Sequence, residues 1–556
     1  MGQASTREGW DVLVIGSGFG GAMAAYAAIE AGLRVLVVER GDWVARGPAN
    51  WEPEGVWELA PFVASSTPYR VLAGADGPYV RPCYCVGGLS VFYGGVSLRL
   101  RERDFEPEPA IVADSRAAWP YHYADLEPYY TRAERLLGVA GEAGVDPTEP
   151  FRSAPYPQLP APLAPASQRI EHAARSLGLT PFRLPLAIHY GGDDGRAPCV
   201  ACMTCDGFAC AIGAKNDIAS AILPALLARG LALETRTAAV RLIVERGRVT
   251  GVECVREPGG ERFVLRARAV ILAAGALASP HLVLASGLER WNPAGAAVGR
   301  YLMRHCNAIV YGLFPRRPNP ERLFHKQLGI HDYYFGHTSV REPAGPLGAI
   351  QQLATPPLAL VRERAPAGLG RFLGPAIEHL TGLLVIAADQ PRAENRVTVD
   401  WADRDRLGLP RLVITHRYAE RDLAARRALI RVARRILWRA GARWFYVHRI
   451  RTFSHAAGTI RIGADPASAP LDEWGRFRGI ENLYVADGSF MPTSGAVNPS
   501  LTIAAHALRC GEHVARVLTV RAAQPAESIR VTRRRPARLE APRSTRAPAR
   551  PAQGED

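Results

Sequence analysis

Lysine is nearly absent from this chain of 556 residues, although its net charge is +15. Lys215 and Lys326 are the only two lysines, so arginine carries almost all of the positive charge. A third of the excess lies in residues 521–556, where nine arginines accompany four acidic residues among proline and alanine. Such a segment has no apolar periodicity and is typical of a disordered basic tail. The charge therefore does not predict a nucleic-acid-binding surface.

The sequence also lacks a long hydrophobic run and a cysteine framework. It has no 18-residue apolar stretch that could span a bilayer, and no signal peptide is predicted, because the first apolar run, DVLVIG, leads directly into a glycine loop. Nine cysteines, an odd number with four clustered, do not suit a secreted disulfide framework. These absences favour a cytoplasmic globular protein, and the length favours two domains.

Residues 11–39 have the pattern of a dinucleotide-binding unit. A strand at 11–15 precedes the loop GSGFGG, an alanine-rich helix follows, and a second strand at 34–38 leads into an acidic residue. The first glycine allows a tight turn, the second lets the backbone approach a pyrophosphate, and the third brings helix and strand together. The helix N-terminus attracts phosphate, and the acid is expected to bind the adenosine ribose. The motif alone does not separate FAD from NAD. The predicted binding residues are Gly16, Gly18, Phe19, Gly20, Gly21, Glu39 and Arg40.

Three later segments have patterns that a plain NAD dehydrogenase does not need. CVGGLSVFYGG (85–95) contains two Gly-Gly steps, which let the backbone pass close to a flat or bulky group. AVILAAGALASPHLVLASG (269–287) predicts a strand, a glycine turn and a helix that Ser279 caps and Pro280 begins. The stretch from 455 to 502 contains HAAGT, VADGS and a helix start at NPSLT. Its polar residues, set between apolar runs, predict a binding or catalytic site.

These motifs resemble the glucose–methanol–choline (GMC) family of FAD-dependent oxidoreductases over most of residues 10–517. The segments WPYHYADLEPYYTRAERLLGV (119–139) and VGRYLMRH (298–305) add to the resemblance. It implies an α/β fold with a Rossmann-like FAD-binding domain assembled from discontinuous segments, and an α+β substrate domain with an antiparallel sheet. The FAD-binding domain would take residues 8–118, 196–308 and 448–520, with 119–195 as a connecting, substrate-side segment, 309–447 as the substrate domain and 521–556 as the tail.

The resemblance also implies the chemistry of the site. An alcohol CH–OH group would be oxidised to a carbonyl by hydride transfer to flavin N5 while a base takes the hydroxyl proton. His455 occupies the position of the base, and Asn498 the second position, where an amide can orient the substrate oxygen. The helix after Pro499 would direct its N-terminus at the N1–C2=O edge of the flavin. The other expected FAD contacts are Gly87, Gly88, Ser90, Tyr93, Gly94, Val240, Ala274, Gly275, Asp487, Gly488, Asn498, Pro499 and Thr502.

Several alternatives stay open at the level of sequence. The substrate is an alcohol, a sterol or a sugar, and the electron acceptor is O2, a quinone or a cytochrome. A lyase with non-redox FAD, or an FAD/iron–sulfur subunit of a membrane-linked sugar dehydrogenase, are the rival functions. Four cysteines spaced C-x2-C-x2-C-x4-C could hold zinc or an iron–sulfur cluster, but the spacing favours structural thiols and no metal. Noncovalent FAD is preferred, although Cys83 and Cys85 lie beside the expected flavin loop. The four clustered cysteines are Cys199, Cys202, Cys205 and Cys210.

Overall fold

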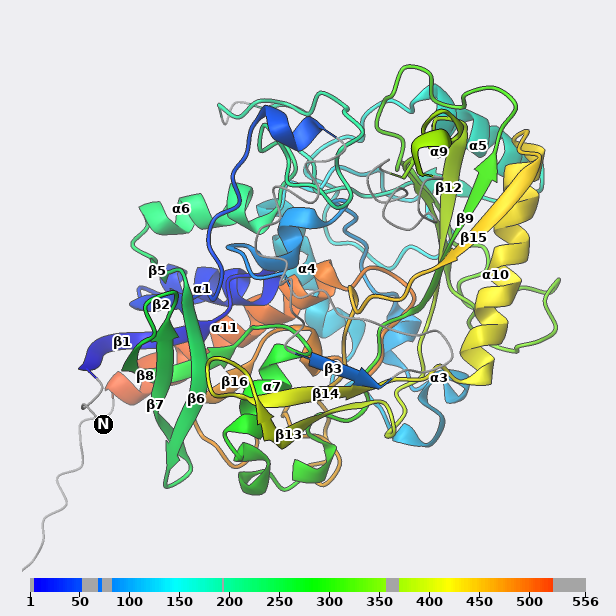
Figure 1. The fold of residues 1–556 in the computed structure, drawn as a ribbon. Coiled ribbons are helices and arrows are strands. Elements are labelled where there is room, and N and C mark those ends of the chain that lie inside the picture. The colour runs from blue at the N-terminus through cyan, green and yellow to red at the C-terminus, as the bar shows by residue number, and fades with distance from the viewer. Residues whose placement is uncertain (1–4, 53–68, 73–82, 193–194, 357–369, 524–556) are drawn as a thin grey trace, which may run out of the picture.

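The computed structural model describes residues 5–52, 69–72, 83–192, 195–356 and 370–523. Within these ranges the strands form three sheets, and the long helices pack on the two larger ones (Figure 1). Segments far apart in the sequence meet in each of these two sheets, so neither sheet belongs to one continuous stretch of chain.

The first sheet has seven strands in the order β5-β2-β1-β8-β7-β6, with β16 paired to β8. The β1, β2, β5, β8 and β16 pairings are parallel, and α1 (Phe19–Glu30) connects β1 to β2. Val12, Leu13 and Val14 are fully buried, as expected for a parallel strand covered on both faces. The two predicted strands, 11–15 and 34–38, therefore lie side by side within this sheet. The strands are β1 (Ser5–Ile15), β2 (Val35–Val38), β5 (Ala232–Glu234), β6 (Thr237–Glu245), β7 (Arg248–Arg256), β8 (Glu261–Leu272) and β16 (Leu483–Val485).

The last helix, α11 (Ser500–Ala523), packs against α1 and α4 (Tyr123–Leu136). A Cβ atom at Gly511 would lie 2.6 Å from the Ala24 carbonyl oxygen, so this glycine allows α1 and α11 to approach closely. The helix extends three residues into the range predicted as a tail. The rest of that predicted tail, 524–556, lies outside the described residues. No helix in the described ranges is long and apolar enough to cross a membrane.

The second sheet has six antiparallel strands in the order β15-β9-β12-β11-β10-β4. It confirms the antiparallel sheet expected for the second domain. The helix α10 (Glu420–Arg439), yellow in Figure 1, covers one face, where Ile436 packs in one cluster with Val310 and Val385. Because side chains alternate along a strand, the other face carries Ile309. The strands are β4 (Pro181–Arg183), β9 (Cys306–Leu313), β10 (Leu328–Ile330), β11 (Ala349–Leu353), β12 (Leu380–Ala387) and β15 (Trp444–Arg449).

A third sheet of three strands joins a piece of the N-terminal region to the second half of the chain. Its order is β13-β14-β3, and β3 runs parallel to β14. The helix α7 packs beside β13 and β6. It begins at Ala278, so Ser279 lies inside the helix, and the prediction that Ser279 caps it was wrong. The strands of this sheet are β3 (Tyr69–Leu72), β13 (Arg396–Arg404) and β14 (Pro410–Thr415). The other α-helices of the described residues are α3 (Pro109–Val112), α5 (Pro165–Arg175), α6 (Leu223–Ala228), α7 (Ala278–Ala285) and α9 (Gly370–Ile377).

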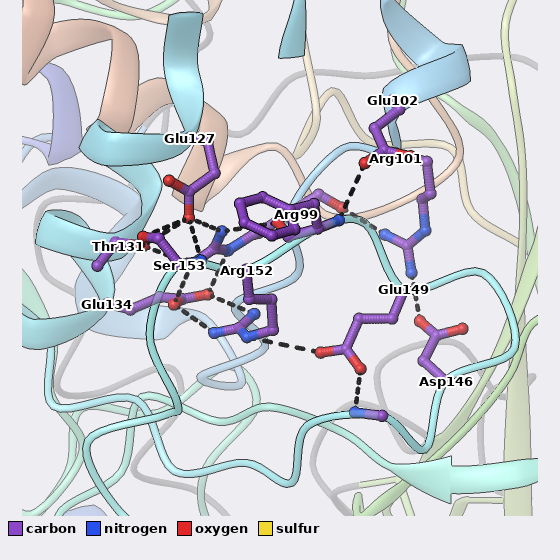
Figure 2. A network of polar contacts seen from close by, with 12 residues as sticks. Arg99, Arg101, Glu102, Glu127, Thr131, Glu134, Asp146, Glu149, Arg152 and Ser153 are labelled. Atoms are coloured by element: carbon purple, nitrogen blue, oxygen red, sulfur yellow. Dashed lines mark hydrogen bonds and ion pairs between the residues drawn. The ribbon is translucent and has the colours of Figure 1, made fainter. Parts of the chain in front are cut away.

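A buried ion network fixes α4 to the chain that follows the Gly-Gly segment (Figure 2). The Arg99 guanidinium donates to both carboxylate oxygens of Glu134, at 2.9 and 2.7 Å, and to Glu127 at 3.0 Å. Arg152 pairs with the same Glu134 carboxylate at 2.5 Å. Removing one partner would leave an uncompensated buried charge, which typically costs about 3–5 kcal/mol. The network therefore holds the segment after Gly95 firmly against α4.

Candidate active site

The loop after β1 is the point where the four predicted glycine motifs meet. A Cβ atom at Gly16 would lie 2.5 Å from the Ala273 carbonyl oxygen, and one at Gly20 would overlap the Ala486 carbonyl. A Cβ atom at Gly21 would overlap the carbonyl oxygen of Gly16 itself. These three glycines are therefore needed for packing, because no side chain would fit between the backbone segments that meet here. The segments are the loop after β1, the start of α1, the turn after β8 and the segment after β16.

Gly18 differs from the other glycines of the loop. Its φ of −71° is open to any residue, and a Cβ atom there would meet nothing closer than the Gly87 carbonyl oxygen at 3.8 Å. It is the N-cap residue of α1, and no side chain caps the helix at this end. The first N–H groups of a helix have no partner within the helix. The open space beside Gly18 and these donors form a cradle that fits a phosphate group.

Glu39 lies directly beside this loop at the end of β2. Its carboxylate accepts hydrogen bonds from the Ser17 amide at 3.1 Å, the Ser17 hydroxyl at 2.6 Å and the Gly41 amide at 2.9 Å. Burial raises the pKa of Glu39, and these three donors oppose that rise. The Ser17 hydroxyl also accepts from the Gly87 amide at 2.9 Å, so Glu39 and the Gly-Gly segment share one contact residue.

Two further predicted contacts, Arg40 and Val240, have distinct surroundings. Arg40 stacks over the Tyr84 ring at 4.3 Å and pairs with Glu257 at 3.6 Å. Val240 is the extra residue of a β-bulge in β6, because the pairing with β7 shifts register between Ala239 and Arg241. A bulge leaves the extra residue's backbone out of the regular ladder, where it can face a ligand.

Asp487 joins two of the later motifs. One carboxylate oxygen accepts from the Gly275 amide at 2.9 Å and from the Ser279 hydroxyl, and the other from the Ser489 amide at 2.9 Å. Burial raises the pKa of this carboxyl group above its ordinary value, and its hydrogen bonds oppose the rise. Its side chain is thus occupied by protein donors, while its backbone lies against Gly20.

The remaining predicted contacts also hold the segments together. The Phe19 ring packs edge-on against Tyr93 with centroids 5.4 Å apart, and the Ala274 amide donates to the Ser279 hydroxyl at 3.1 Å. The Gly488 carbonyl accepts a hydrogen bond from the Gly458 amide at 3.0 Å, and the Pro499 carbonyl accepts one from the Ile503 amide at 2.9 Å. The Thr502 hydroxyl lies 2.8 Å from that of Tyr130 on α4.

Lys215 fastens the Gly-Gly segment to the cysteine-rich segment. Its ammonium group is buried and donates to three backbone carbonyls, those of Tyr93 at 2.8 Å, Cys205 at 3.0 Å and Phe208 at 2.7 Å. Nearby, the Ser90 hydroxyl donates to the Gly87 carbonyl at 2.6 Å. An ammonium group has three donors, so this one is fully satisfied. One of the two lysines of the chain is thus a structural residue.

Gly94 faces the other lysine. A Cβ atom there would lie 2.5 Å from the Lys326 ammonium nitrogen and would overlap the Asp206 carboxylate. Lys326 and Asp206 form an ion pair at 2.8 Å. Glycine at position 94 therefore makes room for a charged pair from two distant parts of the chain.

All nine cysteines lie among the described residues, and all are free thiols. Burial raises the pKa of Cys199 to about 11 and that of Cys205 further, so both stay protonated at neutral pH. No group of three or more metal-ligating side chains in the described ranges is arranged to hold a metal ion. Cys83 and Cys85 have sulfur atoms 3.9 Å apart, and Cys85 lies beside the Gly88 carbonyl.

The two predicted catalytic residues each have a partner that the sequence did not predict. The Nδ1 atom of His455 lies 3.0 Å from Nδ1 of His305. The Oδ1 atom of Asn498 accepts a hydrogen bond from Nε2 of Gln351 at 2.8 Å, and Gln351 lies on β11 of the second sheet. The Asn498 amide nitrogen is therefore the end left to donate toward a ligand.

His455 is held as a neutral imidazole. Burial is the main cause that lowers its pKa from 6.5 to about 3, and the neighbouring His305 and the Lys326 ammonium group add to the lowering, because a proton on His455 would be unfavourable beside them. The residue as a whole is nevertheless only partly buried, whereas His305 is 1% exposed. A neutral, accessible imidazole can accept a proton from a hydroxyl group.

A signal for only one of these partners was present in the sequence. His305 ends the VGRYLMRH motif, which supported the resemblance without being given a role. Gln351 lies in the region 309–447, where the apolar pattern is irregular and no motif marks it. Asp206 and Lys326 belong to segments that meet only in three dimensions.

The fold and this constellation define a flavin-dependent oxidoreductase. The comparison with known proteins makes the identification specific: the chain belongs to the GMC oxidoreductase family. The two sequence models of that family match residues 85–307 and 391–507, and an FAD-binding domain model matches residues 11–49. The protein is thus an FAD-dependent enzyme that acts on CH–OH groups, and FAD is its cofactor.

Individual proteins resemble this chain over nearly its whole length. The 6'''-hydroxyparomomycin C oxidase of Streptomyces lividus is 33% identical, over 91% of each chain. The paromamine 6'-oxidase of Streptomyces fradiae is also 33% identical, over 91% of each chain. Among solved structures, pyridoxine 4-oxidase from Mesorbium loti has a TM-score of 0.66 at 22% identity, covering 91% of this chain and 99% of its own. The last of these supports the fold alone.

Proposed function

We propose that the enzyme oxidises the alcohol with His455 as the base and Asn498 as the residue that positions the substrate oxygen. The observation that carries the proposal is the neutral His455 ring, hydrogen-bonded through Nδ1 and with its other nitrogen left for a ligand. When bound, FAD supplies the acceptor for the hydride. The protein residues supply the proton acceptor, the substrate contacts and the exclusion of water.

The division of labour between the two residues follows from their chemistry. His455 accepts the hydroxyl proton, which increases the negative charge on the substrate oxygen. Asn498 stays neutral at all accessible pH values, so it acts as a donor. With Oδ1 engaged by Gln351, its amide nitrogen donates to the same oxygen and stabilises the charge that develops there. Gln351 thereby fixes which end of the amide faces the substrate.

We further propose that the FAD contacts are those the sequence predicted. The cradle at Gly18 supports the position of the pyrophosphate, Glu39 that of the adenosine ribose, and the bulge at Val240 that of the adenine. The N-terminus of α11 after Pro499 would support the reduced flavin ring. The discontinuous segments 8–118, 196–308 and 448–520 remain our proposal for the FAD-binding domain.

The substrate we propose is a polyhydroxylated, sugar-like alcohol. The support is the similarity to two oxidases whose names give paromamine and a hydroxyparomomycin as their substrates. We place the protein in the cytoplasm, supported by its nine free thiols. The electron acceptor we propose is O2, a quinone or a cytochrome.

The test is anaerobic reduction of the bound flavin, followed by its absorbance, across a panel of sugars, paromamine, sterols and aliphatic alcohols. Bleaching by a sugar-like alcohol is expected, and the His455→Asn variant should bind FAD but reduce it at least about a hundredfold more slowly. The matched control is His513→Asn, because His513 stacks on Trp474, with ring centroids 4.7 Å apart, and takes no part in the proposed chemistry. An undiminished rate in His455→Asn would remove this residue from the role of base.

A further inference from the structure

His305 lies behind His455 in a conformation that few residues adopt. It directly precedes β9, its φ is 60°, and its side chain is 1% exposed. The left-handed region is uncommon for residues other than glycine and is often found where a site constrains the backbone. The Tyr418 hydroxyl donates to the His305 carbonyl at 2.8 Å and so helps to fix this residue.

The second ring nitrogen of His305 determines where its proton is. Nε2 of His305 lies 3.1 Å from the backbone carbonyl oxygen of Ser494. A carbonyl oxygen can only accept a hydrogen bond, so Nε2 must carry a hydrogen. A neutral imidazole has one N–H group, which leaves a lone pair on Nδ1 of His305. Burial lowers the pKa of His305, which favours this neutral form.

The proton position on His455 then follows. Its Nδ1 atom faces a nitrogen that can only accept, so Nδ1 of His455 must be the donor across the 3.0 Å contact. The single hydrogen of a neutral His455 is thereby placed on Nδ1, and the lone pair on Nε2. With the opposite tautomer, Nε2 would carry a hydrogen and could not take up a proton.

We propose that His305 is a positioning residue that fixes the Nδ1–H tautomer of His455 and so keeps its Nε2 atom ready to accept a proton. Through His305, the Ser494 carbonyl determines which nitrogen of His455 carries the proton. Ser494 lies only four residues before Asn498. This inference rests on the proposed role of His455 as the base.

A second set of buried side chains holds His305 in place. The Asp389 carboxylate accepts from the Arg304 amide at 2.8 Å and lies 2.8 Å from Nε2 of His416, and the Asp389 amide donates to the Ser494 hydroxyl at 3.3 Å. Arg304, next to His305, is thus fixed to the Asp389 carboxylate, and Ser494 to the Asp389 backbone amide, so one residue holds both sides of the His305–Ser494 contact. This arrangement explains how the left-handed backbone at His305 is maintained.

Two substitutions at His305 separate its two hydrogen bonds. In His305→Asn the amide oxygen takes the place of Nδ1 and can still accept from His455, and asparagine tolerates the left-handed conformation. In His305→Gln the amide nitrogen takes the place of Nε2 and can still donate to Ser494, but the acceptor facing His455 is lost. The two variants therefore differ in which hydrogen bond they keep: His305→Asn keeps the acceptor for His455, and His305→Gln keeps the donor to Ser494.

The direct readout is the tautomer of His455, measured by 15N NMR of the histidine-labelled holoenzyme with His455→Asn to assign the signal. We expect the Nδ1–H form in the wild type and in His305→Asn, and a shift toward the Nε2–H form in His305→Gln. Flavin content and thermal unfolding check that both variants are folded. An Nε2–H form in the wild type, or an unchanged tautomer in His305→Gln, would overturn the proposal.

The rate of anaerobic flavin reduction by an alcohol found in the screen gives the second readout. His305→Gln is expected to be slower than His305→Asn by at least about tenfold, with KM changed much less than kcat, because a base in the wrong tautomer binds substrate without reacting. A tautomer shift without this loss of rate would overturn His455 as the base and leave the control of its tautomer by His305 standing. The two failures are thus distinguishable.

Discussion

Substitution by alanine at two glycines of the loop GSGFGG is expected to affect different properties: stability at Gly20 and FAD affinity at Gly18. In Gly20→Ala the new methyl group would overlap the Ala486 carbonyl, a backbone atom that cannot move aside without shifting β16. Overpacking of this kind costs about 1–3 kcal/mol, more than the 0.5–1 kcal/mol that alanine gains over glycine in a helix. We expect Gly20→Ala to lower the free energy of unfolding even without FAD.

Gly18→Ala should leave the apoprotein almost unchanged and lose FAD. Its methyl group would lie 3.8 Å from the Gly87 carbonyl oxygen, an ordinary van der Waals distance, and its φ of −71° suits alanine. The poorer N-cap and the reduced chain entropy of the unfolded state oppose each other, so the free energy of unfolding should change by less than about 1 kcal/mol. The methyl group would, however, occupy the proposed pyrophosphate space, and a loss of about 1.4 kcal/mol there is already a tenfold weaker Kd.

The assay combines chemical unfolding of the two apoproteins with a fluorescence titration of each by FAD. The wild type and Gly32→Ala are the controls, the latter because a Cβ atom at Gly32 meets nothing within 4 Å although its φ of 78° adds strain. Wild-type FAD affinity in Gly18→Ala would refute the placement of the pyrophosphate beside this residue. A Gly20→Ala apoprotein as stable as the wild type would refute the packing argument.

Three further results are expected. Because burial holds the pKa of His455 near 3, below its ordinary 6.5, the rate of flavin reduction should stay constant as the pH falls through 6.5, and an acid limb centred at 6.5 would contradict this. The free energy of unfolding linked to this residue should decrease from pH 6.5 toward pH 3, because in that range the unfolded chain takes up a proton that the folded chain does not. Lys215→Met should lower the melting temperature, because three buried carbonyls lose their hydrogen-bond donor at a cost of about 1 kcal/mol or more each. Lys215→Arg should lower the melting temperature less, and equal melting temperatures in the wild type and Lys215→Met would contradict the role of this lysine. Deleting residues 524–556 should leave the rate of flavin reduction unchanged, since every residue proposed for the site precedes this segment, and a fall in rate would show that the segment contributes to the site.

Most of the nucleotide-binding half could be predicted from sequence, because its determinants are local. The order of strand, glycine loop, helix, strand and acid places Gly18 and Glu39 a fixed number of residues apart on adjoining elements. The helix at 500 was predicted within two residues for the same reason. The cap of α7 was not, because Ser279 bonds to Asp487, a residue 208 positions away.

The second half of the site depends on contacts that no local pattern records. Gln351 reaches Asn498 only because six antiparallel strands bring β11 over the start of α11. Lys326 reaches Asp206 and the space above Gly94 in the same way. Alternation along a strand predicts which residues share a face, but which ligand that face meets depends on the docking of the sheet.

By itself the sequence determined the family and the cofactor and singled out the two side chains that we propose for the chemistry, because glycine steps and a polar run between apolar segments have few other uses. The tertiary structure alone decided the state of those side chains. His455 is placed as an Nδ1–H donor because a histidine 150 residues away presents a lone pair to it, and Asn498 presents its amide nitrogen because a glutamine 147 residues away takes its oxygen. Proton positions and amide orientations depend on partners in space, and spacing along the chain does not record them.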